Sequence, residues 1–317
     1  MKNRIYYKAA IDQNLYEQRV SRTEVFLGRT KAEQKEAQKI LSKSIIGIAG
    51  IGGIGGAVAL RLARFGVKKI KLADPDKFDW TNINRQLGAT KKNKGRNKAE
   101  VVGEIVNDLA GDIEIDIFTD GITEDNADEF VQGCDIILDQ IDFSIITQRY
   151  ALHQAFRRNK NIKHILSCSV VGWAAHLYKF EHNSMPIEEW YELNDKSVDS
   201  INTPESADKL VKLFAPRFPH FPPYEDVVRW MNENDGAVPI FAGAPPLAEG
   251  ILVSRTILGL LNREYEPYAK WLPPIPQMYY YDAATLNGEF ITSDGTFKND
   301  LSLERTWKMF DKNKEER

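Results

Sequence analysis

The sequence predicts an α/β fold in which a mostly parallel sheet carries helices on both faces. Short β-rich runs alternate with helical stretches between residues 44 and 168, which is the pattern of strands joined by crossover helices. The first run, "SIIGIA", leads directly into a glycine-rich turn and then a small-residue amphipathic stretch. With 317 residues, 43% of them hydrophobic, the chain can bury one large core or two modest ones.

Five strands and four helices make up the predicted parallel part of the sheet. The strands are residues 44–49, 68–74, 113–118, 134–139 and 163–168, and the helices lie near 54–65, 95–109, 123–131 and 144–158. From Trp173 the run "WAAHLYKF" alternates like an antiparallel strand. A helix at 246–262 and antiparallel strands near "QMYYYDA" and "GEFIT" are expected to extend the sheet towards the C-terminus.

The chain divides into four segments. Residues 1–43 are polar and predict an N-terminal helical arm, with a helix over Thr30–Leu41 that starts at a Thr cap. Residues 44–180 form the main domain, and 247–317 complete it with a helix and strands before a charged, frayed tail. Residues 181–246 are rich in Pro and aromatic side chains and too long for a bare loop. We expect short helices there that form a lid, a surface for a substrate or a segment that packs the dimer.

Composition excludes several classes of protein. A net charge of -3 leaves no overall electrostatic footprint for duplex nucleic acid. The two cysteines, Cys134 and Cys168, form no Cys-x-x-Cys pair, which excludes a four-cysteine zinc site and argues against a disulfide framework. The N-terminus lacks the apolar stretch of a signal peptide, and no run of 18 apolar residues occurs. We therefore expect a soluble, cytoplasmic protein without zinc.

The glycine turn predicts a nucleotide site. Gly50, Gly52 and Gly55 form a Gly-x-Gly-x-x-Gly pattern, with Gly53 inside it, between a strand and a helix. This Rossmann-like arrangement lets a phosphate approach the backbone and the amide donors at the helix N-terminus. Asp74 ends the second strand, where a carboxylate can accept hydrogen bonds from ribose hydroxyls. The alternative is a tight turn without a ligand, and the glycines alone do not separate NAD from ATP.

The stretch after Asp74 favours a triphosphate. Asn82, Arg85 and Gln86 form a short polar segment, and Lys98 follows Arg85 by thirteen residues. A guanidinium fork and an ammonium group can both bind phosphate oxygens. The alternative is a solvated basic loop, for which "KKNKGRNK" is an ordinary composition.

Two carboxylates end the fourth predicted strand, in "LDQIDFS". Asp139 and Asp142 lie at the carboxyl end of the sheet, where ligands of open α/β sheets bind. An oxygen ligand facing a triphosphate suits Mg²⁺, and Asp142 is the candidate. The alternative is that Asp142 caps a helix beginning near Phe143.

In order and spacing, "GIGGIG", "TNINRQ", "GRNK" and "LDQID" resemble the motifs of the ThiF/MoeB/HesA adenylyltransferases, relatives of the ubiquitin-activating enzymes. The resemblance covers about residues 18–180 and 246–290. It implies that residues 44–180 form an adenylation domain that binds ATP and Mg²⁺. Such enzymes transfer AMP to a carboxylate, usually a C-terminal one on a small protein or peptide.

The resemblance also assigns residue roles inside the site. Asp74 would hold the ribose, Mg²⁺ would bind Asp142, and the phosphates would contact Asn82, Arg85 and Lys98. A carboxylate oxygen attacks the α-phosphorus, and these cations stabilise the charge on the leaving pyrophosphate. A carboxylate is already ionised at neutral pH, so the reaction needs no general base.

The same resemblance implies a composite site in a homodimer. Family members typically reach the partner's triphosphate with an N-terminal arginine that stands shortly before a hydrophobic-x-Gly run. In "RVSRTEVFLG" that residue is Arg22, with Arg19 as the alternative.

This sequence departs from many relatives in its cysteines. Cys134 begins a buried strand and Cys168 ends another, so we expect both to be core residues and no thioester to form. The acyl-adenylate would be captured directly by an amide, an amine or a second group of the substrate. The candidates are an enzyme that modifies a peptide, a relative of the enzymes that cyclise carbamoyl-threonine on tRNA, and a sulfur-carrier-protein activator without zinc.

Two functions of other classes remain as alternatives. An NAD-dependent dehydrogenase would transfer hydride and would not need Arg85 or Lys98. A degenerate scaffold without activity would not need Asn82, Arg85, Lys98 and Asp142 together. The near-neutral charge argues modestly against tRNA without excluding it.

Overall fold

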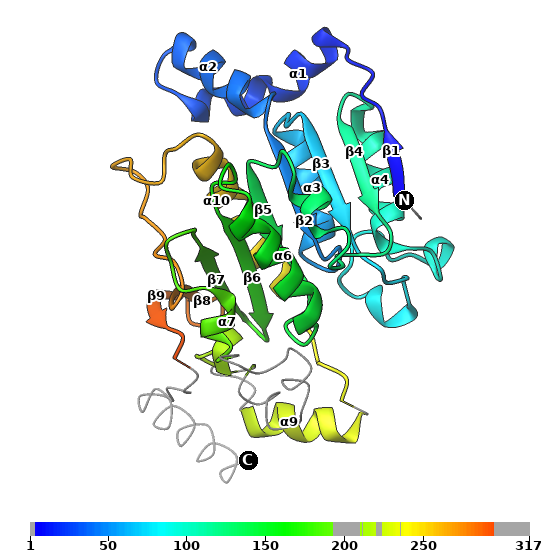
Figure 1. Cartoon of the computed structure of the whole chain (residues 1–317), viewed down its shortest axis with the longest axis vertical. Helices are drawn as coiled ribbons and strands as arrows, with labels where there is room; N and C mark the ends of the chain where they lie inside the picture. Colours follow the sequence, from blue (N-terminus) through cyan, green and yellow to red (C-terminus); the bar gives the residue numbers. More distant parts are fainter. Residues whose placement is uncertain (1–3, 193–209, 211, 220–223, 235, 295–317) are drawn as a thin grey trace, which may run out of the picture.

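A nine-stranded sheet forms the centre of the computed structural model, which describes residues 4–192, 210, 212–219, 224–234 and 236–294. The strand order is β1-β4-β3-β2-β5-β6-β7-β8-β9. Strands β4, β3, β2, β5 and β6 are parallel, whereas β1 at one edge and β7, β8 and β9 at the other run antiparallel to their neighbours (Figure 1). The predicted fold class is therefore confirmed.

The elements follow the predicted order with small shifts at their ends. The strands are β1 (Arg4–Tyr7), β2 (Ile45–Ala49), β3 (Lys69–Ala73), β4 (Glu114–Phe118), β5 (Ile136–Asp139), β6 (Ile165–Val171), β7 (Ala174–Phe180), β8 (Gln277–Asp282) and β9 (Asn287–Thr292). The α-helices are α1 (Gln13–Glu24), α2 (Lys31–Leu41), α3 (Gly55–Arg64), α4 (Lys98–Ala110), α5 (Ala127–Val131), α6 (Ile146–Arg158), α7 (Ile187–Trp190), α9 (Tyr224–Glu233) and α10 (Ala244–Leu260). Short 3₁₀ helices are η1 (Val25–Leu27), η2 (Trp80–Asn82) and η3 (Lys91–Asn93).

The sheet has a switch point between β2 and β5. From β2 the chain moves to β3 and β4 on one side, then crosses back to place β5 on the other side of β2. Connections leaving β2 and β5 therefore diverge, and a crevice opens at the carboxyl ends of these two strands. That crevice positions the site.

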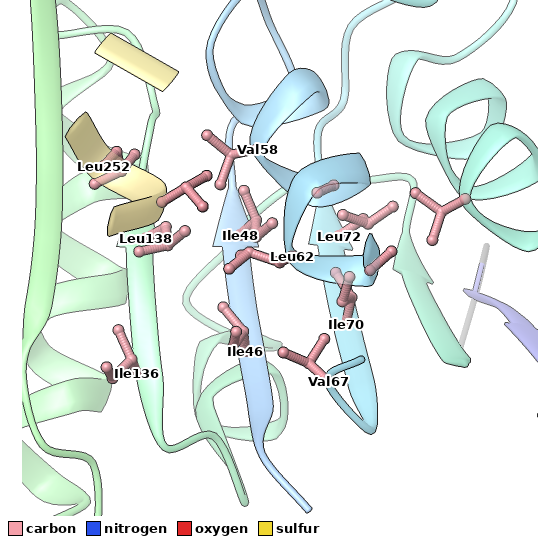
Figure 2. Close-up of a cluster of buried hydrophobic side chains, with 14 of the residues drawn as sticks. Ile46, Ile48, Val58, Leu62, Val67, Ile70, Leu72, Ile136, Leu138 and Leu252 are labelled. Atoms are coloured by element: carbon pink, nitrogen blue, oxygen red, sulfur yellow. The ribbon is translucent and has the colours of Figure 1, made fainter. Parts of the chain in front are cut away.

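Helices cover both faces of the sheet because the strand residues alternate in direction. On one face, Ile46 and Ile48 of β2 lie against Val58 and Leu62 of α3, and Leu252 of α10 completes this core (Figure 2). The other face forms a second buried cluster with helices α5, α6 and α7. All five residues named here are buried.

The N-terminal segment contains a strand that the sequence analysis did not predict. Residues Arg4–Tyr7 form β1 along the free edge of β4, where Arg4 pairs with the fully buried carboxylate of Asp116. This pair and the β1–β4 hydrogen bonds cover an edge that would otherwise be open. Helix α2 is capped by Thr30, as predicted, and the Thr30 side chain accepts a hydrogen bond from the Glu33 backbone in a capping box.

Helices α1 and α2 lie across the end of the sheet where the parallel strands begin, away from the crevice (Figure 1). The Tyr16 hydroxyl of α1 donates to the carbonyl of Gly66, just before β3. Arg19 forms two hydrogen bonds with the carboxylate of Asp112, just before β4. These contacts fix α1 to the amino ends of the strands.

The predicted insert at 181–246 contributes to the core as well as to the surface. Its described part contains α7 and α9, and Trp190, Leu213 and Phe214 are buried in the cluster beneath α6. Helix α9 has no buried residue and lies beyond the carboxyl ends of the strands (Figure 1). The predicted frayed tail lies outside the described residues after Asp294. In the described part of the chain, no helix is long and apolar enough to cross a membrane.

Candidate active site

A cleft of about 500 Å³ opens at the switch point between β2 and β5. Several parts of the chain line it. One wall comes from the glycine turn, the end of β3 and the segment 82–98; the floor comes from residues 140–145. A second wall comes from the end of β6, from Tyr178 and from Phe214. The segment 238–245 also lines the cleft and contacts the first wall, because Ile240 lies against Asn84 and Pro245 against Gly53. The lining includes ten residues that the sequence analysis assigned to a nucleotide site: Gly50, Gly52, Gly53, Gly55, Asp74, Asn82, Arg85, Gln86, Lys98 and Asp142.

The glycine turn is built for close backbone approach. Gly50 has a φ of +90°, and a Cβ there would lie 2.1 Å from the carbonyl oxygen of Gln140. A Cβ on Gly55 would lie 1.9 Å from the carbonyl oxygen of Gly50. Helix α3 then begins without a side-chain cap, so its first amide groups remain available to an anion in the cleft.

Gly52 and Gly53 differ in what surrounds them. A Cβ on Gly52 would meet only the Gln86 amide at 3.9 Å, which leaves this side of the turn open to the cleft. A Cβ on Gly53 would lie 3.2 Å from Pro245, so the start of α10 rests against the turn. Residues nearly 200 positions apart therefore meet at this site.

Asp74 is a buried carboxylate held by the backbone. It is 6% exposed, and its two oxygens accept hydrogen bonds from the backbone N–H groups of Ile51 and Asp76. Burial raises the pKa of Asp74, and the charge of Lys98 partly offsets that effect. Each carboxylate oxygen retains a second lone pair, which leaves acceptor capacity for a ribose hydroxyl.

The two predicted phosphate cations already have partners. Lys98 is the first residue of α4, and its ammonium group lies 2.9 Å from Oδ2 of Asp76. Nη1 of Arg85 donates to the carbonyl of Thr81 and to Oδ1 of Asn84. Burial lowers the pKa of Arg85, whereas the facing charge of Asp142 raises it. Both cations line the cleft, and a triphosphate would compete with these neutral or exposed partners.

Two amide side chains in the same wall differ in their partners. Asn82 closes η2, because its Oδ1 accepts a hydrogen bond from the Asp79 backbone. Gln86 is 7% exposed, and its Oε1 has no hydrogen-bond partner among the described residues. A buried amide oxygen without a donor is uncommon, so this side chain is suited to a ligand in the cleft.

Asp142 does not cap a helix. Helix α6 begins at Ile146, with Ile145 at its N-cap and no side-chain cap. Asp142 is exposed, and its Oδ1 accepts hydrogen bonds from the backbone and the hydroxyl of Ser144. The alternative of a helix cap near Phe143 is therefore wrong. Asp142 and Ser144 both line the cleft.

Among the described residues, no group of three or more His, Cys, Asp or Glu side chains could hold a metal ion. Mg²⁺ at a nucleotide needs only one or two carboxylates, because phosphates and waters supply the remaining oxygens. Asp142, facing Arg85 across the cleft, meets that requirement.

The cleft is also lined by a charged residue that the sequence analysis missed. Arg149 of α6 lines the cleft although it is 1% exposed, and it lies 2.7 Å from Oδ2 of Asp139. The ring of Phe214 lies 4.4 Å from its guanidinium carbon. An arginine on the inner face of a helix that follows "LDQID" is the signal that could have revealed it.

Both cysteines are buried, and Cys168 also lines the cleft. Burial raises the pKa of the Cys134 thiol to about 12 and moves that of Cys168 in the same direction.

Arg22 does not line the cleft of its own chain. It is exposed on α1, at the opposite end of the sheet, and forms no hydrogen bond or ion pair with the residues that the structure describes. The alternative residue, Arg19, is engaged by Asp112. Val25 and Phe26, just after Arg22, are 60% and 86% exposed.

Comparison with known proteins places this site in a family. The model of the ThiF family matches residues 28–215. The chain is 33% identical over 136 residues to the tRNA threonylcarbamoyladenosine dehydratase of Escherichia coli (strain K12), a match covering 43% of this chain and 50% of the relative. It is 27% identical over 161 residues to a probable molybdopterin-synthase adenylyltransferase of Gracilaria tenuistipitata var. liui, covering 51% and 42%. The chain spans about half the length of these curated relatives.

Solved structures resemble a larger share of the chain. Selenomethionine-labelled PaaA has a TM-score of 0.63 at 14% identity, over 92% of this chain and 77% of PaaA. E. coli MccB with MccA-N7isoASN has a TM-score of 0.62 at 18% identity, over 87% of this chain and 72% of MccB. At these identities the likeness establishes a shared fold and leaves the substrate open.

The matched region of 188 residues covers more than half of the chain, from α2 to the end of β7 and beyond. It contains the glycine turn, Asp74, the segment 82–98 and Asp142, which together line one cleft. The chain belongs to the ThiF family.

Proposed function

We propose that this chain is an ATP·Mg²⁺-dependent adenylyltransferase that activates a carboxylate or amide on a peptide or small protein. The observation that carries the proposal is a single cleft with two different walls. One wall combines the glycine turn with Asp74, Arg85 and Lys98, and the other continues past Asp142 to Tyr178 and Phe214. The first wall suits a nucleotide, and the second leaves room for the group to be activated.

The chemistry follows from charge. A carboxylate oxygen of the substrate forms a bond to the α-phosphorus while the bond to pyrophosphate breaks, so negative charge grows on the leaving group. Arg85 and Lys98 would bind the phosphates and stabilise that charge in a partly desolvated cleft. Mg²⁺, when bound at Asp142, would neutralise phosphate charge. The substrate carboxylate is ionised at neutral pH, and the step requires no base.

We propose that the acyl-adenylate is captured directly. Both thiols are buried and their pKa values are raised, so neither is a ready thiolate at neutral pH. An amide, an amine or a second group of the substrate would attack the activated carbonyl carbon and displace AMP. A thioester on Cys168 is the competing route, because this residue lines the cleft.

The composition of the second wall favours a peptide or small protein as the substrate. Phe214 of this wall comes from the segment 181–246, as do Val238 and Ile240, and the three give the cleft an aromatic and aliphatic lining. Sulfur-carrier activation fits the same wall, because it also requires a peptide-like C-terminus.

Similarity to the E. coli tRNA threonylcarbamoyladenosine dehydratase supports a second candidate, cyclisation of a carbamoyl-threonine on tRNA. The net charge of -3 offers no general attraction for a polyanion, which makes this candidate weaker. An NAD-dependent dehydrogenase would leave the cations in the cleft without a role.

We further propose a cytoplasmic homodimer in which Arg22 of each subunit reaches the partner's triphosphate. Arg22 is exposed and far along the sheet from its own cleft, so it can act only on another molecule. The exposed side chains of Val25 and Phe26 beside it are suited to a subunit contact.

ATP–pyrophosphate exchange tests the proposal. Wild-type protein is incubated with labelled pyrophosphate, Mg·ATP and, in separate arms, a peptide library, tRNA or protein-free cell extract. Exchange in the peptide arm supports peptide activation, and exchange only with tRNA supports the second candidate. Binding of NADH without binding of Mg·ATP would overturn the assignment to adenylation.

A further inference from the structure

Three buried ionisable side chains lie next to the floor of the cleft, and the chemistry above gives them no role. Asp139 ends β5, and Arg149 and His153 lie four residues apart on α6. Nη2 of Arg149 is 2.7 Å and Nε2 of His153 is 3.0 Å from Oδ2 of Asp139. Their exposed fractions are 0%, 1% and 2%.

The three groups carry one negative and one positive charge. Burial alone would raise the pKa of Asp139, but Arg149 and His153 hold it below its ordinary value. Burial opposes the charge on Arg149, but the facing carboxylate of Asp139 raises its pKa. Burial lowers the pKa of His153, so its ring is neutral and its Nε2–H donates to Asp139. A buried ion pair of this kind is not in itself a source of stability.

Asp139 and Arg149 hold the two peptide groups on either side of the Ile141 Cα, while His153 contacts only Asp139. The backbone N–H of Ile141 donates to Oδ1 of Asp139 at 3.2 Å. The carbonyl of Ile141 accepts from Nη1 of Arg149 at 3.5 Å. The preceding carbonyl, that of Gln140, lies directly beneath Gly50. The next residue along the chain is Asp142, about 3.8 Å away between Cα atoms.

We infer that Asp139, Arg149 and His153 are positioning residues that aim the Asp142 carboxylate at the nucleotide's metal ion without touching it. The inference rests on the proposed function, because it takes Mg·ATP as the ligand of the cleft. Partners behind a metal ligand commonly set its orientation, and losing one typically weakens metal binding by about 10–100-fold. Here the partners act through the backbone of Ile141.

The test measures metal affinity instead of turnover. Calorimetry follows binding of the non-hydrolysable analogue α,β-methylene-ATP while Mg²⁺ is titrated. Arg149→Lys keeps a cation beside Asp139 but lacks the second nitrogen that reaches Ile141. We expect its apparent Mg²⁺ affinity to fall by about 10–100-fold. In an Asp142→Asn background the same change should add nothing, because both act through one ligand.

A matched control separates positioning from general destabilisation. Leu152→Ala removes a fully buried apolar side chain from the same helix and takes away no hydrogen bond to the Ile141 backbone, so it should lower Tm but leave Mg²⁺ affinity unchanged. Should Arg149→Lys fail to fold, Asp139→Asn combined with Arg149→Met removes both charges together and avoids an unpaired buried ion. The same loss of Mg²⁺ affinity is expected from it.

Three results would overturn the positioning role. The first is an unchanged Mg²⁺ affinity in folded Arg149→Lys. The second is a further loss of Mg²⁺ affinity when Arg149→Lys is added to Asp142→Asn. The third is a loss of Mg²⁺ affinity in Leu152→Ala as large as that in Arg149→Lys. Wild-type protein that binds no ATP analogue would overturn the proposed function, and this inference with it. Normal binding by wild type together with normal Mg²⁺ affinity in Arg149→Lys would overturn the positioning role alone.

Discussion

The ammonium group of Lys98 lies 2.9 Å from the carboxylate of Asp76, so this cation of the cleft is held in place before any nucleotide binds. Its side chain is 10% exposed, whereas that of Asp76 is 65% exposed. A contact with such an exposed carboxylate contributes about 1 kcal/mol or less to folding. We therefore expect Lys98 to contribute to nucleotide binding and catalysis more than to folding stability.

Lys98→Ala should reduce the rate of adenylation by about 10²–10³-fold, which is the scale for removing one preorganised group that stabilises developing charge. Thermal unfolding should change little. Lys91→Ala is the matched control, because Lys91 is an exposed lysine of the same basic segment outside the cleft, and it should retain full exchange activity. Equal activity of the two variants would contradict a phosphate role for Lys98.

Asp142→Asn should impair turnover and Mg²⁺ dependence much more than folding. The side chain is exposed and does not cap α6, so its loss removes no buried contact. Pyrophosphate exchange at varied Mg²⁺, read beside thermal unfolding, measures both properties. A lower Tm with unchanged specific activity would show that the Ser144 contacts are the residue's whole contribution.

Cys134→Ala and Cys168→Ala should each keep substantial activity, because the proposed route forms no enzyme thioester. Both thiols are buried, and alkylation of the native protein should be slow at neutral pH. Exchange and product formation are compared in soluble, folded variants. If Cys168→Ala retained pyrophosphate exchange but lost all product, direct capture would be wrong.

Stability should fall as the pH decreases from about 6.5 towards about 4. Burial lowers the pKa of His164 to about 3, assisted by three nearby cations, and that of His176 to about 4. Both rings stay neutral in the folded protein, whereas the unfolded chain binds protons. Well below pH 6.5, each histidine therefore lowers the free energy of unfolding by about 1.4 kcal/mol for every pH unit. Urea unfolding at several pH values measures the slope, and His176→Gln should reduce it.

Activity should require a dimer in which Arg22 acts on the neighbouring cleft. Arg22→Ala and Lys98→Ala are each expected to be inactive. After subunit exchange half of the dimers are mixed and carry one intact site of two, which restores about a quarter of wild-type activity. Arg19→Ala is the comparison: it breaks the pair with Asp112 and should lower stability. Demonstrated exchange without recovery would contradict the role in trans.

Local patterns were enough to predict one wall of the site. The functional importance of Gly50 can be inferred from the sequence, because only a residue without a Cβ fits against the Gln140 carbonyl. Strand–turn–helix order places Asp74 at the carboxyl end of β3, and motif spacing places Arg85 and Lys98 nearby. These features depend on neighbours within one βαβ unit, which a sequence displays directly.

From residue 44 onward, the sequence by itself determined the order of the strands and helices, the mostly parallel α/β class and the residues that line one wall of the cleft. Only the tertiary structure decided what lies behind them. Arg4–Tyr7 becomes a strand because the β4 edge and the buried Asp116 receive it. Arg149 reaches Asp139 because α6 crosses β5, and the cleft is complete because α10 returns to Gly53 from nearly 200 residues away. Such contacts arise from packing between distant elements, which no local pattern records.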